Sequence, residues 1–127
     1  MAKKLAMIFG VIFILVGLLG FFNNPVLGLF AVNGAHNLVH LIIGIALVVM
    51  SAQGEAMAVK SLKIFGVVYL LVAILGFFMM SPMLGIIVFN GADNWLHLVL
   101  GIVLLALGFS SKSGNMMPGG GMGMPQA

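Results

Sequence analysis

Polar residues that could bind a ligand gather in two similar segments of an otherwise apolar sequence. The segments are NGAHNLVHLIIGIAL, which begins at Asn33, and NGADNWLHLVLGIVL, which begins at Asn90. At helical spacing their polar residues fall on or beside one stripe of each helix. We predict that these side chains form one cluster within the membrane: Asn33, His36, Asn37, His40, Asn90, Asp93, Asn94 and His97.

Three kinds of chemistry fit this cluster, because an ionisable group about 10 Å inside a membrane span needs a partner. In the structural interpretation, His40 and His97 each contact an asparagine or a backbone carbonyl of the other half of the chain. In the second, the same two histidines ligate a haem, or His36 and His40 bind a metal together with His97 or Asp93. In the third, the cluster lines an ion or proton path through an oligomer.

We favour the structural interpretation and therefore predict no catalytic residue, no cofactor and no metal. The residues at the starts of the two segments have a simpler explanation. Asn33 and Asn90 are suited to cap helices, and Asp93 then lies in the first turn, where its carboxylate can complete a capping box and interact with the helix dipole.

Four apolar runs must position these residues, over residues 5–22, 35–50, 62–80 and 92–109. Each run is at or just under the length that crosses about 30 Å of hydrocarbon. The runs form two copies of one unit, because IFGVIFILVGLLGFF from Ile8 is matched by IFGVVYLLVAILGFF from Ile64. We therefore predict an all-α membrane bundle of four helices, built from tandem two-helix repeats (residues 5–50 and 62–109) with pseudo-twofold symmetry about the membrane normal. The predicted packing glycines are Gly10, Gly17, Gly20, Gly44, Gly66, Gly76 and Gly101.

The composition supports a lipid environment, since 63% of the 127 residues are hydrophobic and only 6% are charged. The absence of cysteine excludes thiolate metal sites and cysteine nucleophiles. The sequence pI of about 9.7 comes from five scattered lysines, which favours anionic lipid over nucleic acid as a partner. No nucleophile, acid pair or phosphate loop indicates an enzyme.

All the lysines lie near one set of span ends, which predicts that both termini are cytoplasmic. They are Lys3, Lys4, Lys60, Lys63 and Lys112. The segment SAQGEAMAVK, residues 51–60, is predicted to be a simple turn.

The two outer connections are apolar, and each opens with a polar residue and a proline, Asn24-Pro25 and Ser81-Pro82. That pattern is typical of a helix start, so we expect a short interfacial helix in each, with a strand as the alternative.

A membrane domain over residues 1–110 is expected to precede a disordered tail over residues 111–127. The tail methionines, at positions 116, 117, 122 and 124, could offer thioethers to Cu(I), although a tail without a ligand is the simpler interpretation.

The segments from His36 to Gly44 and from Asn90 to Gly101, with a tyrosine in the third span, resemble an uncharacterised family of bacterial and archaeal four-span membrane proteins, classed as a domain of unknown function. The resemblance covers nearly the whole chain except the tail. It implies a membrane location and four spans, and it implies no activity, ligand or catalytic residue. Trp95 would anchor the protein at headgroup depth.

We therefore expect a non-enzymatic protein of the prokaryotic cell membrane. Its expected role is that of an accessory, scaffold or envelope component that self-associates or docks in a larger membrane assembly.

Overall fold

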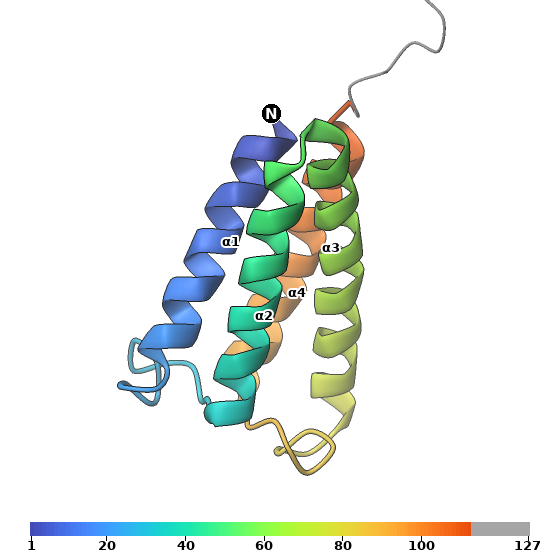
Figure 1. Ribbon diagram of the computed structural model, residues 1–127. Helices are drawn as coiled ribbons and strands as arrows, with labels where there is room; N and C mark the ends of the chain where they lie inside the picture. Colours follow the sequence, from blue (N-terminus) through green and yellow to red (C-terminus); the bar gives the residue numbers. More distant parts are fainter. Residues whose placement is uncertain (113–127) are drawn as a thin grey trace, which may run out of the picture.

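The computed structural model describes residues 1–112, which form a bundle of four α-helices (Figure 1). The helices are α1 (Ala2–Leu19), α2 (Gly34–Ala52), α3 (Glu55–Phe78) and α4 (Gly91–Ser110). Each is long and apolar enough to cross a membrane. The chain is thus an integral membrane protein, and the predicted all-α membrane bundle is confirmed. The tail methionines, at positions 116, 117, 122 and 124, lie outside the described residues.

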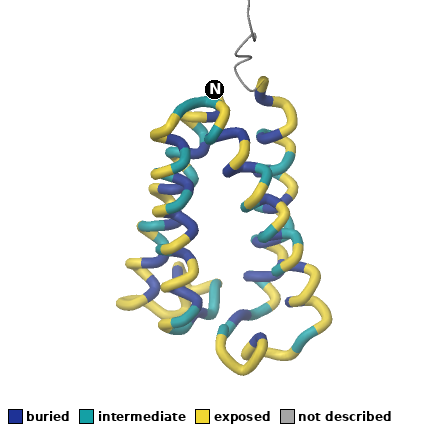
Figure 2. The backbone as a smooth tube through the Cα atoms, turned by 45° about the vertical axis from the view of Figure 1, so that its right-hand side comes forward, coloured by how far each residue is buried: buried dark blue, intermediate teal, exposed yellow. Residues whose placement is uncertain are grey.

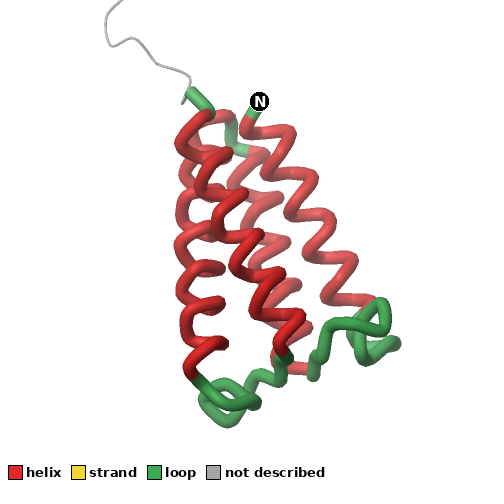
Figure 3. The backbone as a smooth tube through the Cα atoms, turned by 180° about the vertical axis from the view of Figure 1, so that it is seen from behind, coloured by secondary structure: helices red, strands yellow, loops and turns green. Residues whose placement is uncertain are grey.

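The two ends of the bundle differ in character (Figures 1 and 3). The start of α1, the turn between α2 and α3 and the end of α4 lie at one end, together with all five lysines; we call this the lysine end. The connections over residues 20–33 and 79–90 lie at the opposite end, which we call the loop end. The polar segments of α2 and α4 begin at the loop end.

The start of α3 differs from the prediction, which placed a turn over residues 51–60. Only Gln53 and Gly54 separate α2 from α3. Gly54 has a φ of 128°, a conformation that glycine adopts without strain, so the chain reverses within two residues. Because the turn is this short, α3 begins at Glu55 instead of near residue 62.

The helices pack as two close pairs, α1 with α2 and α3 with α4. Glycines allow the close approach: a methyl group on Gly10 would lie 2.8 Å from the Gly44 carbonyl oxygen, and one on Gly44 would lie 2.7 Å from the Gly10 carbonyl oxygen. At each predicted packing glycine an added methyl group would meet an atom of the paired helix at less than 3 Å. All of these glycines are therefore used for packing inside the chain.

The loop-end connections are not helices, and within the described residues no strand forms (Figure 3). Each is a tight turn closed by a single bridge, Val26 with Phe30 and Met83 with Ile87. Leu27 and Leu84 both have a φ of 53°, and a glycine with positive φ follows each, so the chain turns back where a helix would need negative φ.

Asn24 and Ser81 have a different role from the predicted helix caps. The Asn24 side-chain oxygen accepts a hydrogen bond from the Val32 amide at 3.1 Å, and the Ser81 hydroxyl accepts one from the Phe89 amide at 3.2 Å. Both bonds tie the start of a connection to its end. The prolines that follow are preceded by cis peptide bonds.

Figure 2 shows buried and exposed positions along all four helices. Most of the buried residues are apolar, and many exposed residues are large and hydrophobic. Phe13, Leu47, Leu62, Tyr69 and Leu104 belong to the core. Large hydrophobic side chains cover the outside of all four helices, which is the surface that lipid would solvate. Val26 and Met83, one from each loop-end connection, are also buried, so each connection packs one side chain into the protein at the loop end.

Candidate functional site

The polar cluster is held by the first turns of α2 and α4. Asn33 caps α2 by accepting a hydrogen bond from the His36 amide at 3.0 Å, and Asn90 caps α4 by accepting one from the Asp93 amide at 3.0 Å. Asp93 Oδ2 in turn accepts from the Asn90 amide at 2.8 Å, which completes a capping box. These caps fix where the following histidines enter the bundle.

The two capping asparagines also join the halves of the chain. Asn33 Nδ2 donates to the Ile86 carbonyl at 2.7 Å, and Asn90 Nδ2 donates to the Leu29 carbonyl at 2.8 Å. Leu29 and Ile86 occupy equivalent positions in the two aligned segments, as the asparagines do. The bonds are therefore reciprocal: each cap holds the connection of the opposite half.

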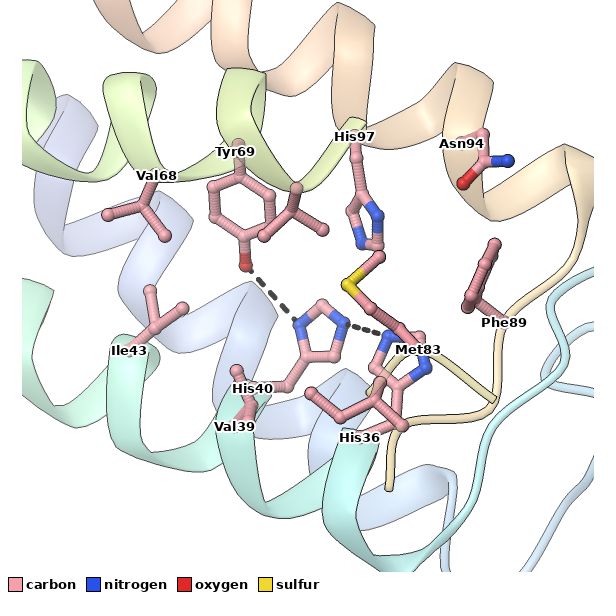
Figure 4. Close-up of a pocket in the computed structure, with 12 residues that line it drawn as sticks. His36, Val39, His40, Ile43, Val68, Tyr69, Met83, Phe89, Asn94 and His97 are labelled. Atoms are coloured by element: carbon pink, nitrogen blue, oxygen red, sulfur yellow. Dashed lines mark hydrogen bonds between the residues drawn. The ribbon is translucent and has the colours of Figure 1, made fainter. Parts of the chain in front are cut away.

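A chain of hydrogen bonds runs through the interior of the cluster (Figure 4). His36 Nδ1 lies 2.6 Å from the Val88 carbonyl oxygen, and His36 Nε2 lies 3.2 Å from His40 Nε2. His40 Nδ1 lies 3.5 Å from the Tyr69 hydroxyl. This series of hydrogen bonds thus runs from the α3–α4 connection to α2 and on to α3.

The direction of each bond follows from the acceptor at one end. Val88 O can only accept, so His36 Nδ1 carries a proton and, in a neutral ring, His36 Nε2 is an acceptor. His40 Nε2 then donates to His36, which leaves His40 Nδ1 to accept from the Tyr69 hydroxyl.

The His97 ring faces His36, His40 and Tyr69 but is not part of this series of hydrogen bonds. It is only 4% exposed, and its Nδ1 has no hydrogen-bond partner. Its ring centroid lies 5.7 Å from that of His36, 6.1 Å from that of His40 and 5.3 Å from that of Tyr69. Figure 4 shows the three histidine rings pointing toward one another.

A cavity of about 60 Å³ lies beside these rings. It is lined by the three histidines, Tyr69 and Asn94, with apolar side chains around them: Val39, Ile43, Val68, Val72, Met83, Ile87 and Phe89. One ligand atom from each of His36, His40 and His97 lies within 4.8 Å of the others. The group is therefore compact enough for a single metal ion.

The remaining predicted residues lie beside this group and not within it. Asn94 Nδ2 donates to the Gly76 carbonyl at 2.8 Å, near the end of α3. Asn37 is buried next to Gly20, and its side-chain oxygen has no hydrogen-bond partner. Asp93 serves as a cap and is not among the clustered ligand atoms. Trp95 is 62% exposed and packs edge-on against Phe77.

The predicted partners of the two deep histidines were wrong. The contact with a backbone carbonyl of the other half is made by His36, whereas His40 contacts His36 and Tyr69. The Nδ1 atom of His97 contacts no hydrogen-bonding group. The reason is geometric: His36 lies one turn nearer the loop end, where the Val88 carbonyl is within reach.

Sequence reasoning missed Tyr69 and Glu55. Tyr69 aligns with Phe13 in the first half, so the difference between the copies adds one hydroxyl to an apolar span, and this was the available signal. Glu55 accepts hydrogen bonds from the Ala2 and Lys3 amides at 2.5 and 3.1 Å and so caps α1 from α3. No local pattern predicts that contact.

The fold and the site together define a four-helix integral membrane protein with a compact, buried histidine group at one end of its bundle. The family comparison agrees with this class. The chain belongs to the family described as Domain of unknown function (DUF4383), whose model matches residues 3–110. No curated protein and no solved structure matches the chain.

Proposed function

We propose that this chain is a non-enzymatic structural component of a prokaryotic cell membrane, a duplicated two-helix unit that acts as an accessory or scaffold subunit. The reciprocal bonds of Asn33 and Asn90 carry the proposal, because they lock the two halves at equivalent positions. A unit locked in this way presents one fixed outer surface to lipid and to neighbouring proteins.

The use of the two acidic residues supports a role without catalysis. Glu55 and Asp93 are the only carboxylic side chains in the sequence. Both bond to backbone amides at helix starts, Glu55 at α1 and Asp93 at α4. A carboxylate that acts as a general acid or base, or that orients a histidine in that role, must lie at the site, and neither carboxylate is placed with the three histidines.

The proposed orientation has the lysine end in the cytoplasm. Positively charged residues near span ends are retained on that side. The loop end, with exposed Phe22, Phe78 and Trp95, then lies at the outer headgroup region, where aromatic side chains are favoured.

Self-association or docking in a larger assembly would use the outer surface, since the packing glycines are occupied within the chain. The chain lacks cysteine, so single cysteines test this directly. Leu15→Cys, Ile42→Cys, Leu71→Cys and Ile102→Cys place one thiol on the exposed face of each helix. A face that contacts a second copy gives a covalent dimer in native membranes, whereas buried Leu47→Cys, the matched control, gives none.

The crosslinking results distinguish self-association from docking in a larger assembly. A disulfide-linked dimer through one helix face supports self-association, and a crosslink to another membrane protein supports docking in an assembly. If every variant stays monomeric under oxidation in native membranes, the scaffold proposal is wrong. Histidine-dependent ion flux through liposomes that contain the purified protein would instead establish the channel alternative.

A further inference from the structure

The histidine group has a feature that the structural role does not require. A hydrogen-bonded chain from Tyr69 to Val88 needs only His36 and His40, yet His97 is buried against it with an unpartnered ring nitrogen. We propose that His36, His40 and His97 bind one first-row transition-metal ion of the zinc type, at the cavity that their side chains line.

The spacing of the ring nitrogens is close to that of a metal site. Two nitrogens bound to one tetrahedral Zn²⁺ at 2.0–2.1 Å lie about 3.3 Å apart. His36 Nε2 and His40 Nε2 are 3.2 Å apart. The His97 ligand nitrogen lies within 4.8 Å of the other two, so closing the site requires a shift of at most about 1.5 Å by the His97 side chain. That shift breaks no hydrogen bond at His97 Nδ1, which holds none.

The unpartnered nitrogen of His97 is an independent observation that points to a ligand. Buried polar atoms in proteins almost always have a partner, and leaving one unsatisfied costs about 1–3 kcal/mol. Ligation of a metal ion through Nδ1 would supply that partner. The Met83 and Phe89 side chains, which line the same cavity, offer no hydrogen-bonding donor to do so.

The outer contacts of two histidines are those that metal-ligating imidazoles make. A ligating histidine typically donates its other ring N–H to a carbonyl, carboxylate or water, which fixes the ring. His36 already does so through Nδ1 to the Val88 carbonyl. For His40 to ligate through Nε2, its proton must reside on Nδ1, which then donates to the Tyr69 oxygen. The bond between Tyr69 and His40 therefore reverses when metal binds, and no proton is lost from the protein.

The cavity leaves room for a fourth ligand and provides a nearby negative charge. A volume of about 60 Å³ holds an ion together with a water, since one water needs about 10–15 Å³ by the same measure. Asp93 lies in the first turn of α4, one helical turn before His97, and its carboxylate accepts from the Asn90 amide. Its carboxylate offsets part of the charge that a divalent ion brings into an apolar interior.

Zinc binding to the purified full chain tests the proposal. The protein is prepared with an affinity tag that lacks histidine, stripped with a chelator, placed in nanodiscs and titrated with Zn²⁺ alone. We expect one zinc per chain by calorimetry and elemental analysis. We also expect Co²⁺ in its place to give the visible absorption of a tetrahedral complex.

His97→Phe is the decisive variant, because it removes a ligand while keeping a ring of similar size and losing no hydrogen bond at Nδ1. We expect it to fold as the unmodified chain does and to lose stoichiometric zinc. Tyr69→Phe should keep the stoichiometry and weaken affinity about 10–100-fold, as outer-contact variants do. Asn37→Ala, a buried polar change on α2 outside the group, is the matched control and should bind zinc with unchanged affinity.

Each outcome decides the proposal. Loss of zinc in folded His97→Phe, with retention in Asn37→Ala, supports it. If the unmodified chain binds no zinc, or if His97→Phe binds it as tightly as the unmodified chain, the proposal is wrong. A variant that fails to fold is replaced by His97→Gln, judged by the same criterion. The proposal is independent of self-association, which the crosslinking experiment measures separately.

Discussion

Gly76→Ala tests how the polar residues of α4 are fitted against α3. A methyl group at this position would overlap the Asn94 side-chain oxygen and would lie 2.8 Å from Asn94 Cγ. The Asn94 amide must then withdraw from the helix. Its hydrogen bond to the Gly76 carbonyl, 2.8 Å long in the unmodified chain, is lost at the same time.

The cost combines two effects of known size. Overpacking a well-filled interior costs about 1–3 kcal/mol, and leaving a buried polar group unsatisfied costs about 1–3 kcal/mol. The Gly76 carbonyl belongs to the last turn of α3, where it has no partner within the helix. We therefore expect a loss of about 2–6 kcal/mol in the free energy of unfolding.

The assay is equilibrium unfolding of the purified protein in mixed micelles with increasing sodium dodecyl sulfate. Gly91→Ala is the matched control, since nothing lies within 4 Å of the added methyl group, and it should change stability little. The double variant Gly76→Ala/Asn94→Ala removes the overlap and should recover part of the loss. Equal stability of Gly76→Ala and Gly91→Ala would refute the reasoning.

Three further predictions concern the cluster. Asn33→Asp keeps the helix cap but replaces the donor to the Ile86 carbonyl with an oxygen. It should therefore lower the free energy of unfolding by about 1–3 kcal/mol in the same assay. Unchanged stability would contradict the role of the reciprocal bonds. Zn²⁺ at 100 times its Kd should raise the unfolding free energy by about 2.7 kcal/mol and raise Tm, and this gain should be absent in His97→Phe. Without metal, Tyr69→Phe should cost only about 0.5–1.5 kcal/mol, because one long hydrogen bond is lost; a greater loss would mean that the Tyr69 hydroxyl has another partner.

The parts of the fold that depend on local composition could be predicted from the sequence. Apolar runs of spanning length identify four helices, because lipid leaves the backbone no other way to satisfy its hydrogen bonds except a barrel. The caps at Asn33 and Asn90 follow from residue type and position, and both are present. Helical spacing also indicated that His36, His40 and His97 are close enough to act together.

Features that depend on tertiary contacts were not accessible in this way. An Asn-Pro or Ser-Pro pair before apolar residues suggests a helix, yet Leu27 and Leu84 adopt positive φ because bonds from Asn24 and Ser81 close each connection into a turn. The choice of His36 over His40 as the partner of a backbone carbonyl depends on where Val88 lies, and spacing along one helix carries no such information.

The proposed orientation, four spans with the lysine end in the cytoplasm, is measured most directly by labelling single cysteines in intact cells. Asn23→Cys and Met80→Cys place exposed thiols at the loop end, and Gln53→Cys places one at the lysine end. A maleimide that does not cross membranes should label the two loop-end thiols from outside, and Gln53→Cys only after permeabilisation. Labelling of Gln53→Cys in intact cells, or of only one loop-end thiol, would contradict the account.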